Sequence, residues 1–280
     1  MMLSIVCPND DAGTVFAASA GRTRSVPLRT ALLAQRPQVE ARAALYLGHG
    51  EAATLFQLAP VAPQGVDAAQ LGGIYDRVLV KGGERALYDR LRGSARLGRC
   101  PLCAQRDAKT LDHYLSKDEY PELAVFPANL TPACFECNHA KRTYRALVAD
   151  EQLFHPYFDD WGAYRLLLAE IEVGARVTSN FSIRAPAQVD DEIIARARAH
   201  FEQLDLATLY EEHASVELVE RKDMFRRTFE ADGAEGLQEE LAQESRSRRR
   251  FNRNGWQVAL YRALSRSEDF CGGGFEHIDE

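Results

Sequence analysis

Four cysteines in the middle of the chain have the order and spacing of a zinc site. Cys100 and Cys103 form one Cys-x-x-Cys pair, and a second pair follows at Cys134 and Cys137. Tetrahedral Zn²⁺ takes four thiolates from two such pairs when a turn of chain brings them together. The sequence therefore predicts a structural zinc ion. The alternative is a set of disulfides or redox-active thiols, which is less common in proteins that carry no export signal.

Residues suited to phosphodiester hydrolysis stand between and just after the two cysteine pairs. His113 supplies an imidazole with a pKa near neutrality, as a general base acting on water requires. Asp112 and Asn138 offer oxygen ligands to a hard catalytic ion such as Mg²⁺ or Mn²⁺, which would neutralise charge on the reacting phosphate. Lys141, three residues after Asn138, would contact that phosphate as a point charge.

Each of these residues also has a structural explanation. An Asp-His pair is often a hydrogen-bonded pair without catalytic function, and Lys141 is a solvated helix lysine by default. Asn129 fits a turn and Asn138 fits a helix cap. His139 follows Asn138 by one residue, so on a helix it is expected to face away from the metal. The alternative is that His139, and not Asn138, is the last ligand.

Short elements are predicted to position these residues. Thr110 to Tyr114 has the β-branched and apolar content of a strand, and the chain returns through Asn129 and Leu130 to the second cysteine pair. From Cys134 onward the sequence has helix formers without Gly or Pro, which predicts a helix that begins there. Two strands and a helix thus converge on His113.

The order DH, then N, then CNxxK between two CxxC pairs resembles the HNH (ββα-metal) endonuclease family. The similarity covers about residues 96–145, and Asn138 stands where that family usually has its last His. The resemblance implies that His113 is the general base, that Asp112 and Asn138 bind the catalytic ion, and that Asn129 orients the base.

The remainder of the chain is predicted to be mainly helical, around a small zinc-bound ββα nuclease module. We expect a mostly helical N-terminal region at 1–95, the HNH module at 96–150, and a helical scaffold or docking region at 151–280. Predicted helices in the last region are 190–206, 207–230, 234–250 and 254–267. No apolar run is long enough for a membrane span, and cytoplasmic residence is expected.

Charge bears on the partners of the protein. The net charge of −7 is unfavourable for DNA binding, but residues 96–145 contain eight Lys and Arg against six Asp and Glu. The one dense basic run, at residues 245–253, is predicted to contact either nucleic acid or a protein partner. Its arginines are Arg246, Arg248, Arg249, Arg250 and Arg253.

The sequence therefore predicts a metal-dependent endonuclease that cleaves DNA and depends on a protein partner. A looser similarity, in the DHYLxK and HPYFDD segments, is to the HNH subunits of Septu-type anti-phage defence systems, which implies an ATPase partner. Two alternatives remain open. One is a zinc-stabilised adaptor protein with a vestigial site, and the other is an RNA-directed nuclease.

Overall fold

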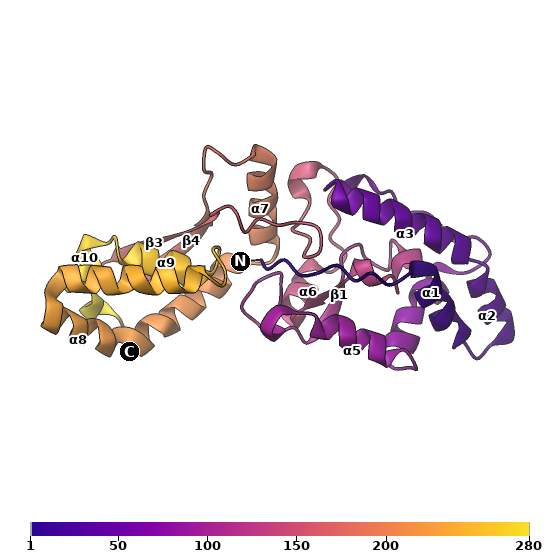
Figure 1. The fold of residues 1–280 in the computed structure, drawn as a ribbon, viewed down its shortest axis with the longest axis horizontal. Coiled ribbons are helices and arrows are strands. Elements are labelled where there is room, and N and C mark those ends of the chain that lie inside the picture. The colour runs from indigo at the N-terminus through magenta and orange to yellow at the C-terminus, as the bar shows by residue number, and fades with distance from the viewer. Residues whose placement is uncertain (1, 280) are drawn as a thin grey trace. The chain divides into compact units, whose positions relative to one another are not determined.

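The computed structural model describes residues 2–279, which divide into two compact units (Figure 1). The first unit is Met2–Asp160 and the second begins at Trp161. The sequence predicted boundaries after residues 95 and 150, whereas the structure has one boundary, between Asp160 and Trp161. The regions 1–95 and 96–150 form one unit because their side chains share a core.

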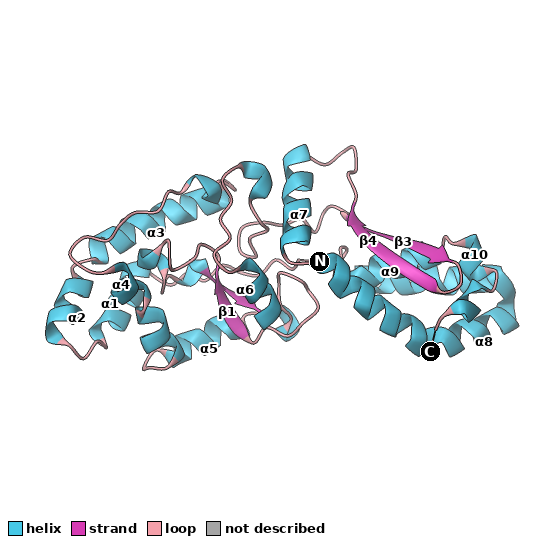
Figure 2. Cartoon of the chain, turned by 180° about the vertical axis from the view of Figure 1, so that it is seen from behind, coloured by secondary structure: helices cyan, strands magenta, loops and turns pink. Residues whose placement is uncertain are grey.

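Helices and two short strands make up the first unit (Figure 2). Asp11 caps the first helix by accepting a hydrogen bond from the Thr14 amide at 2.8 Å. The segment 2–7 has no regular secondary structure. The elements are α1 (Ala12–Gly21), α2 (Val26–Leu33), α3 (Arg36–Glu51), α4 (Ala68–Gly72), a π-helix (Tyr75–Val80), α5 (Arg85–Gly93), β1 (Thr110–His113), β2 (Leu130–Ala133) and α6 (Phe135–Lys141).

The core of this unit joins the N-terminal helices to the strands. Phe16, Leu32 and Val39 from α1, α2 and α3 belong to the same buried cluster as Leu111 of β1 and Leu130 of β2. Burial of such side chains stabilises each by roughly 1.5–3 kcal/mol. The N-terminal helices therefore supply apolar side chains that pack with the short strands in one core.

Strands β1 and β2 pair antiparallel, and α6 follows directly. Leu111 stands opposite Pro132, and His113 stands opposite Leu130. Helix α6 begins after Cys134, whose Sγ accepts a hydrogen bond from the Cys137 amide at 3.3 Å. The predicted strand, return strand and helix are all present. The helix ends at Lys141, because Arg142 has a φ of 44° that no α-helix accommodates.

The second unit contains a β-hairpin that the sequence did not predict. Strand β3 (Leu167–Val173) pairs with β4 (Val177–Ile183). The predicted helices are present as α7, α8 and α9, and α8 is broken at Gly233, where φ is 69°. The helices are α7 (Asp191–Gln203), α8 (Leu206–Arg249), α9 (Trp256–Leu264) and α10 (Glu268–Cys271).

The predicted fold class is thus correct in its coarse form. The described residues are mainly helical, with two small antiparallel sheets. Within residues 2–279, no helix has both the length and the apolar character needed to cross a membrane.

Candidate metal centre and active site

The four predicted zinc ligands come together in the structure. The sulfurs of Cys100, Cys103, Cys134 and Cys137 all lie within 4.8 Å of one another, and all four residues are buried. Zinc–sulfur bonds of about 2.3 Å place the sulfurs of a tetrahedral site about 3.8 Å apart. The donor set and its spacing therefore fit a structural metal such as zinc.

Backbone amides help to hold this cysteine cluster. The Arg106 amide donates to Cys103 Sγ at 3.4 Å, and the Cys100 amide donates to the Arg106 carbonyl at 2.8 Å. Hydrogen bonds from the three other thiols lower the pKa of Cys103. The amide contacts fix the loop that carries Cys100 and Cys103 around the candidate metal position.

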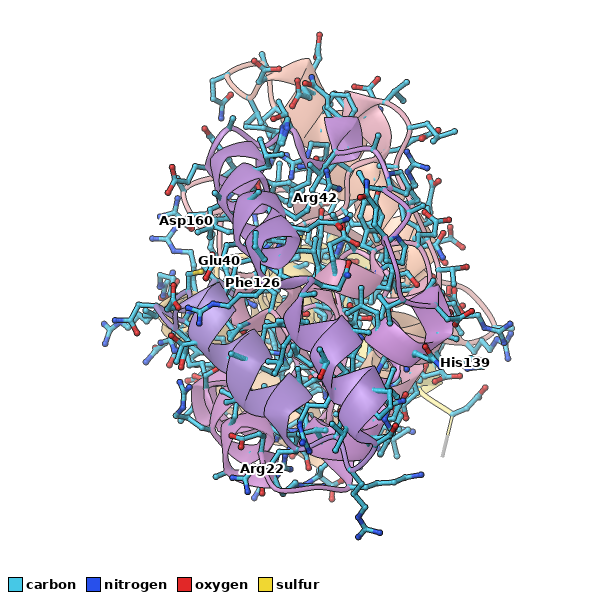
Figure 3. The ribbon with its side chains drawn as sticks, turned by 90° about the vertical axis from the view of Figure 1, so that its right-hand side faces the viewer. Arg22, Glu40, Arg42, Phe126, His139 and Asp160 are labelled. Carbon is cyan, nitrogen blue, oxygen red and sulfur yellow. The ribbon has the colours of Figure 1, made fainter. Side chains whose placement is uncertain are left out.

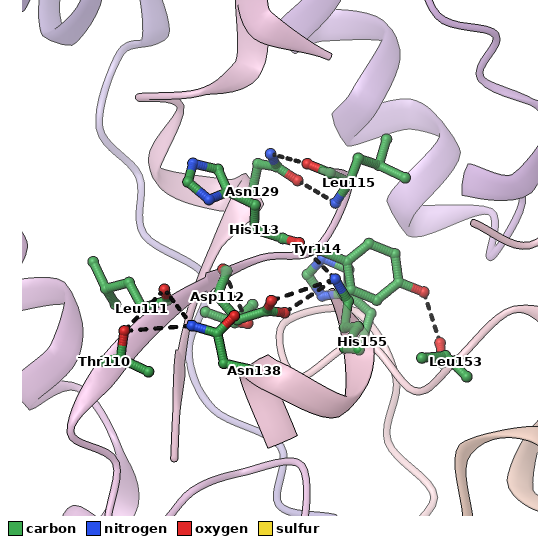
Figure 4. Close-up of polar contacts among 12 residues, drawn as sticks. Thr110, Leu111, Asp112, His113, Tyr114, Leu115, Asn129, Asn138, Leu153 and His155 are labelled. Atoms are coloured by element: carbon green, nitrogen blue, oxygen red, sulfur yellow. Dashed lines mark hydrogen bonds and ion pairs between the residues drawn. The ribbon is translucent and has the colours of Figure 1, made fainter. Parts of the chain in front are cut away.

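The Asn138 side chain fastens helix α6 to strand β1. The Asn138 amide nitrogen donates to the Leu111 carbonyl at 3.2 Å and to Thr110 Oγ1 at 3.4 Å (Figure 4). Among the described residues, Asn138 Oδ1 has no hydrogen-bond partner. Because the strand holds the nitrogen, the oxygen points away from these bonds, which is compatible with the predicted role of Asn138 as a ligand.

Asp112 is buried on the same side of β1, beside Lys141. Lys141 Nζ lies 3.2 Å from Asp112 Oδ2, and both side chains are 3% exposed. Oδ2 nevertheless has no partner with hydrogen-bond geometry. Burial raises the pKa of Asp112 to about 6, although Lys141 acts in the opposite direction. Asp112 is therefore a buried carboxylate whose Oδ2 faces the Lys141 ammonium without a well-aligned hydrogen bond.

The structure gives Lys141 a different place from the one expected. Its ammonium donates to the His113 carbonyl at 2.6 Å as well as to Asp112, and it lies 5.7 Å from the centre of the Tyr114 ring. A lysine buried in this way neutralises Asp112 and does not extend toward a bound phosphate. This geometry does not support the predicted contact between Lys141 and a bound phosphate.

His113 is held by a backbone carbonyl of the loop before β2. Its Nε2 donates to the Ala124 carbonyl at 2.8 Å, and its ring lies edge-on to Tyr75 at 4.4 Å. A carbonyl only accepts hydrogen bonds, so the proton of the neutral ring is on Nε2 and Nδ1 carries the free lone pair. Burial lowers the pKa of His113 to about 4, below the near-neutral value expected from the sequence, so the ring is neutral at pH 7 but a weaker base than predicted.

Asn129 acts on the loop and not on His113 itself. It is fully buried, its Oδ1 accepts from the Leu115 amide at 2.8 Å, and its Nδ2 donates to the Leu115 and Leu123 carbonyls. Leu123 precedes Ala124, whose carbonyl holds the imidazole. Asn129 thus positions His113 indirectly. Ala124 and Tyr75 were not predictable from the sequence, because a carbonyl acceptor and an edge-on ring depend on the path of the loop.

His113 lies on the opposite side of β1 from Asp112 and Asn138 (Figure 4). Successive side chains of a strand point to opposite faces, and His113 is the last residue of β1. A phosphate must therefore lie across the end of the strand to meet the imidazole and the oxygen ligands together.

The outer face of α6 is hollowed and accessible. An open depression there is lined by Asn138, His139, Arg142 and the exposed ring of Phe135. His139 is exposed at the surface of the first unit and accepts a hydrogen bond from Arg142 at 2.6 Å (Figure 3). It therefore faces away from Asp112, as predicted.

The predicted basic run divides into paired and unpaired arginines. Arg246 forms an ion pair with Glu239, and Arg248 forms ion pairs with Glu217 and Glu244. Arg249, Arg250 and Arg253 form no ion pair among residues 2–279. Arg246 and Arg248 are thus already neutralised within the protein.

The chain is similar to Protein ea31 of Escherichia phage lambda. The two sequences are 29% identical over 215 residues, which cover 71% of this chain and 67% of the phage protein. No family model matches the chain, and no solved structure matches it. The name of the phage protein states no activity, so only the residues of the site indicate a function for this chain.

Proposed function

We propose that this protein is a zinc-stabilised, metal-dependent HNH endonuclease that hydrolyses phosphodiester bonds of DNA. One observation carries the proposal. A hairpin and a helix anchored by four cysteines present three groups that accept no hydrogen bond from any residue between 2 and 279, although Lys141 is ion-paired with one of them, Asp112. These are the groups that such a reaction needs. They are His113 Nδ1, Asp112 Oδ2 and Asn138 Oδ1.

The residues divide the chemistry among them. The Ala124 carbonyl keeps the His113 proton on Nε2, so Nδ1 accepts a proton from the attacking water. Asp112 and Asn138 would hold Mg²⁺ or Mn²⁺, which supplies charge stabilisation at the phosphate. Lys141 keeps Asp112 ionised in its buried position, since burial alone favours the neutral acid.

A zinc-stabilised adaptor protein is the second candidate. The specific observation in its favour is the buried Asp112–Lys141 pair, in which the ammonium already stands beside the carboxylate that would bind the ion. In that case the two residues lock α6 onto β1 and the site is vestigial. Substitution of His113 would then leave every biological effect unchanged.

The partner remains part of the proposal. An acidic chain gains little from long-range attraction to DNA, so a protein that holds the substrate would assist cleavage. An ATPase partner in an anti-phage defence complex accounts for this need. An RNA-directed nuclease is the closest variant of the same chemistry, because phosphodiester hydrolysis by this site does not depend on the sugar.

A substrate comparison tests the proposal. Zinc-loaded protein is incubated with supercoiled plasmid DNA, and separately with single-stranded RNA, in Mg²⁺ or Mn²⁺, with and without the proteins that co-purify with it. Metal-dependent nicking of plasmid is expected, and chelation of Mg²⁺ should stop it. Cleavage of RNA alone would move the proposal to the RNA variant, and no cleavage of either substrate under any of these conditions would favour the adaptor.

A further inference from the structure

Six arginines of the second unit lie close enough to interact electrostatically around Arg165 and Arg262. They come from four separate stretches of sequence, and only two of them belong to the basic run. This arginine cluster consists of Arg165, Arg184, Arg249, Arg253, Arg262 and Arg266.

The open end of the β3–β4 hairpin brings the stretches together. Arg165 precedes β3 and Arg184 follows β4, and the Arg184 amide donates to the Leu166 carbonyl at 2.8 Å. Helix α9 packs along β3. Arg262 lies on α9, and Arg266 lies in the turn that directly follows the helix, where its amide donates to the Ala263 carbonyl at 3.1 Å.

A buried asparagine fixes this arrangement. Asn254 is 3% exposed, its Oδ1 accepts from the Leu166 amide at 2.7 Å, and its Nδ2 donates to the Tyr164 carbonyl at 3.0 Å. The neighbouring Arg253 donates to the Ala163 carbonyl. The end of α8 and the start of β3 are therefore held together, so the cluster is part of the framework of the unit.

No carboxylate neutralises the cluster. None of its six arginines forms an ion pair with any residue between 2 and 279, although Arg221, Arg226, Arg246 and Arg248 of the same unit all do. Acidic residues outnumber basic ones in this unit, so the absence of partners is local to the cluster.

The guanidinium groups are close enough to affect one another. Burial, together with Arg165, Arg266 and Arg184, lowers the pKa of Arg262 to about 10. Burial and the neighbouring arginines also lower the pKa of Arg165, whose Nε is buried without a hydrogen-bond partner. A bound polyanion would remove this repulsion and supply the missing acceptor.

We propose that the arginine cluster binds the phosphate backbone of a nucleic acid. Guanidinium groups match phosphate oxygens in pairs, and a nucleic acid strand presents closely spaced phosphates along its length. The choice of nucleic acid over an acidic protein rests on the proposed nuclease function. Arg249, Arg253 and Arg266 are exposed and would make the first contacts.

The test measures binding separately from cleavage. The full chain carrying His113→Ala, without added divalent ion, is titrated into a fluorescent 30-base-pair DNA duplex at several salt concentrations. The cluster variant is Arg184→Gln, Arg249→Gln and Arg266→Gln. The matched control removes three charges elsewhere on the unit through Arg176→Gln, Arg227→Gln and Arg246→Gln. Thermal unfolding verifies that both variants are folded, and Arg→Lys at the three cluster positions serves as a second, charge-preserving variant.

The cluster variant should bind more weakly and lose about three from the slope of log K against log salt, since each phosphate contact contributes about one. The control and the lysine variant should keep most of that slope. Equal loss in the cluster variant and the control would overturn the proposal. Equally tight binding of poly-glutamate by the His113→Ala protein would also overturn it, in favour of an acidic protein. The two proposals can fail separately. If the cluster variant loses DNA binding but the wild-type protein never cleaves, the binding role of the arginine cluster is supported and the nuclease proposal fails.

Discussion

The ammonium group of Lys141 lies beside a carboxylate that has no other basic partner near it. Removing the lysine leaves Asp112 buried and uncompensated, since both side chains are 3% exposed. We expect Lys141→Met to lower the free energy of unfolding by about 3–5 kcal/mol. Urea denaturation of the zinc-loaded protein measures this change.

Lys109→Met is the matched control for that substitution, because Lys109 is well exposed in its pairing with Asp107. It should change stability by less than about 0.5 kcal/mol. Unchanged stability in Lys141→Met, together with lost cleavage, would contradict the structural role. It would support the original prediction that Lys141 contacts the phosphate.

Asn138 supplies the second oxygen that we assign to the catalytic ion. Its Nδ2 is bonded to the Leu111 carbonyl, which leaves Oδ1 for the ion. Asn138→Ala in zinc-loaded protein should weaken Mn²⁺ binding by about tenfold or more, as measured by calorimetry. His139→Ala, one residue further and exposed, should leave it unchanged. The opposite result would make His139 the ligand.

At the scale of elements, the cysteine cluster holds together a hairpin and a helix too small to be stable alone. Two four-residue strands and a seven-residue helix bury little apolar surface, whereas structural zinc contributes on the order of 10–16 kcal/mol in small peptides. Cys137→Ser should reduce zinc from about one ion per chain to near zero, with loss of hydrogen-exchange protection in residues 100–141. Cys7→Ser, outside the cluster, should retain the zinc, and full zinc content in Cys137→Ser would refute a four-thiolate site.

The buried Arg42–Glu122 ion pair joins α3 to the loop before β2. Burial raises the pKa of Glu122 despite Arg42. A raised pKa means that the folded protein holds this proton more tightly than the unfolded chain. The contribution to stability is thus greatest below the unfolded pKa of about 4.3, and it is lost as pH rises through the folded pKa. In Glu122→Gln this part of the pH dependence of unfolding should disappear. An unchanged pH profile would show that Glu122 does not titrate differently on folding.

Elements with strong local signals were predictable from the sequence. The strand at Thr110 and the helix after Cys134 follow from β-branched content and from the absence of Gly and Pro. The β3–β4 hairpin was missed although Gly174, Ala175 and Arg176 form its turn. The burial of Lys141 and the carbonyl that holds His113 were beyond prediction, because both depend on which loop packs against β1. The same is true of the arginine cluster, since Arg165 and Arg266 are distant in sequence and meet only through packing.

At the scale of the whole molecule, the chain separates into a unit with the metal centre and a unit with the arginine cluster. The core of the first unit lies within residues 2–160, so these residues should fold without the rest. A fragment of residues 1–160 should bind about one zinc and unfold cooperatively, as circular dichroism with metal analysis would reveal. A fragment that binds no zinc and lacks helical signal would contradict this division.

We propose that the zinc-anchored hairpin presents His113 as the base for metal-dependent DNA cleavage. The most direct measurement is single-turnover nicking of supercoiled plasmid in Mn²⁺ by zinc-loaded wild-type protein, His113→Ala and His139→Ala, together with the co-purifying proteins. We expect His113→Ala to lower the rate by about 10²–10⁴-fold with zinc content unchanged, while His139→Ala cleaves as the wild type does. Equal rates for wild type and His113→Ala would contradict it.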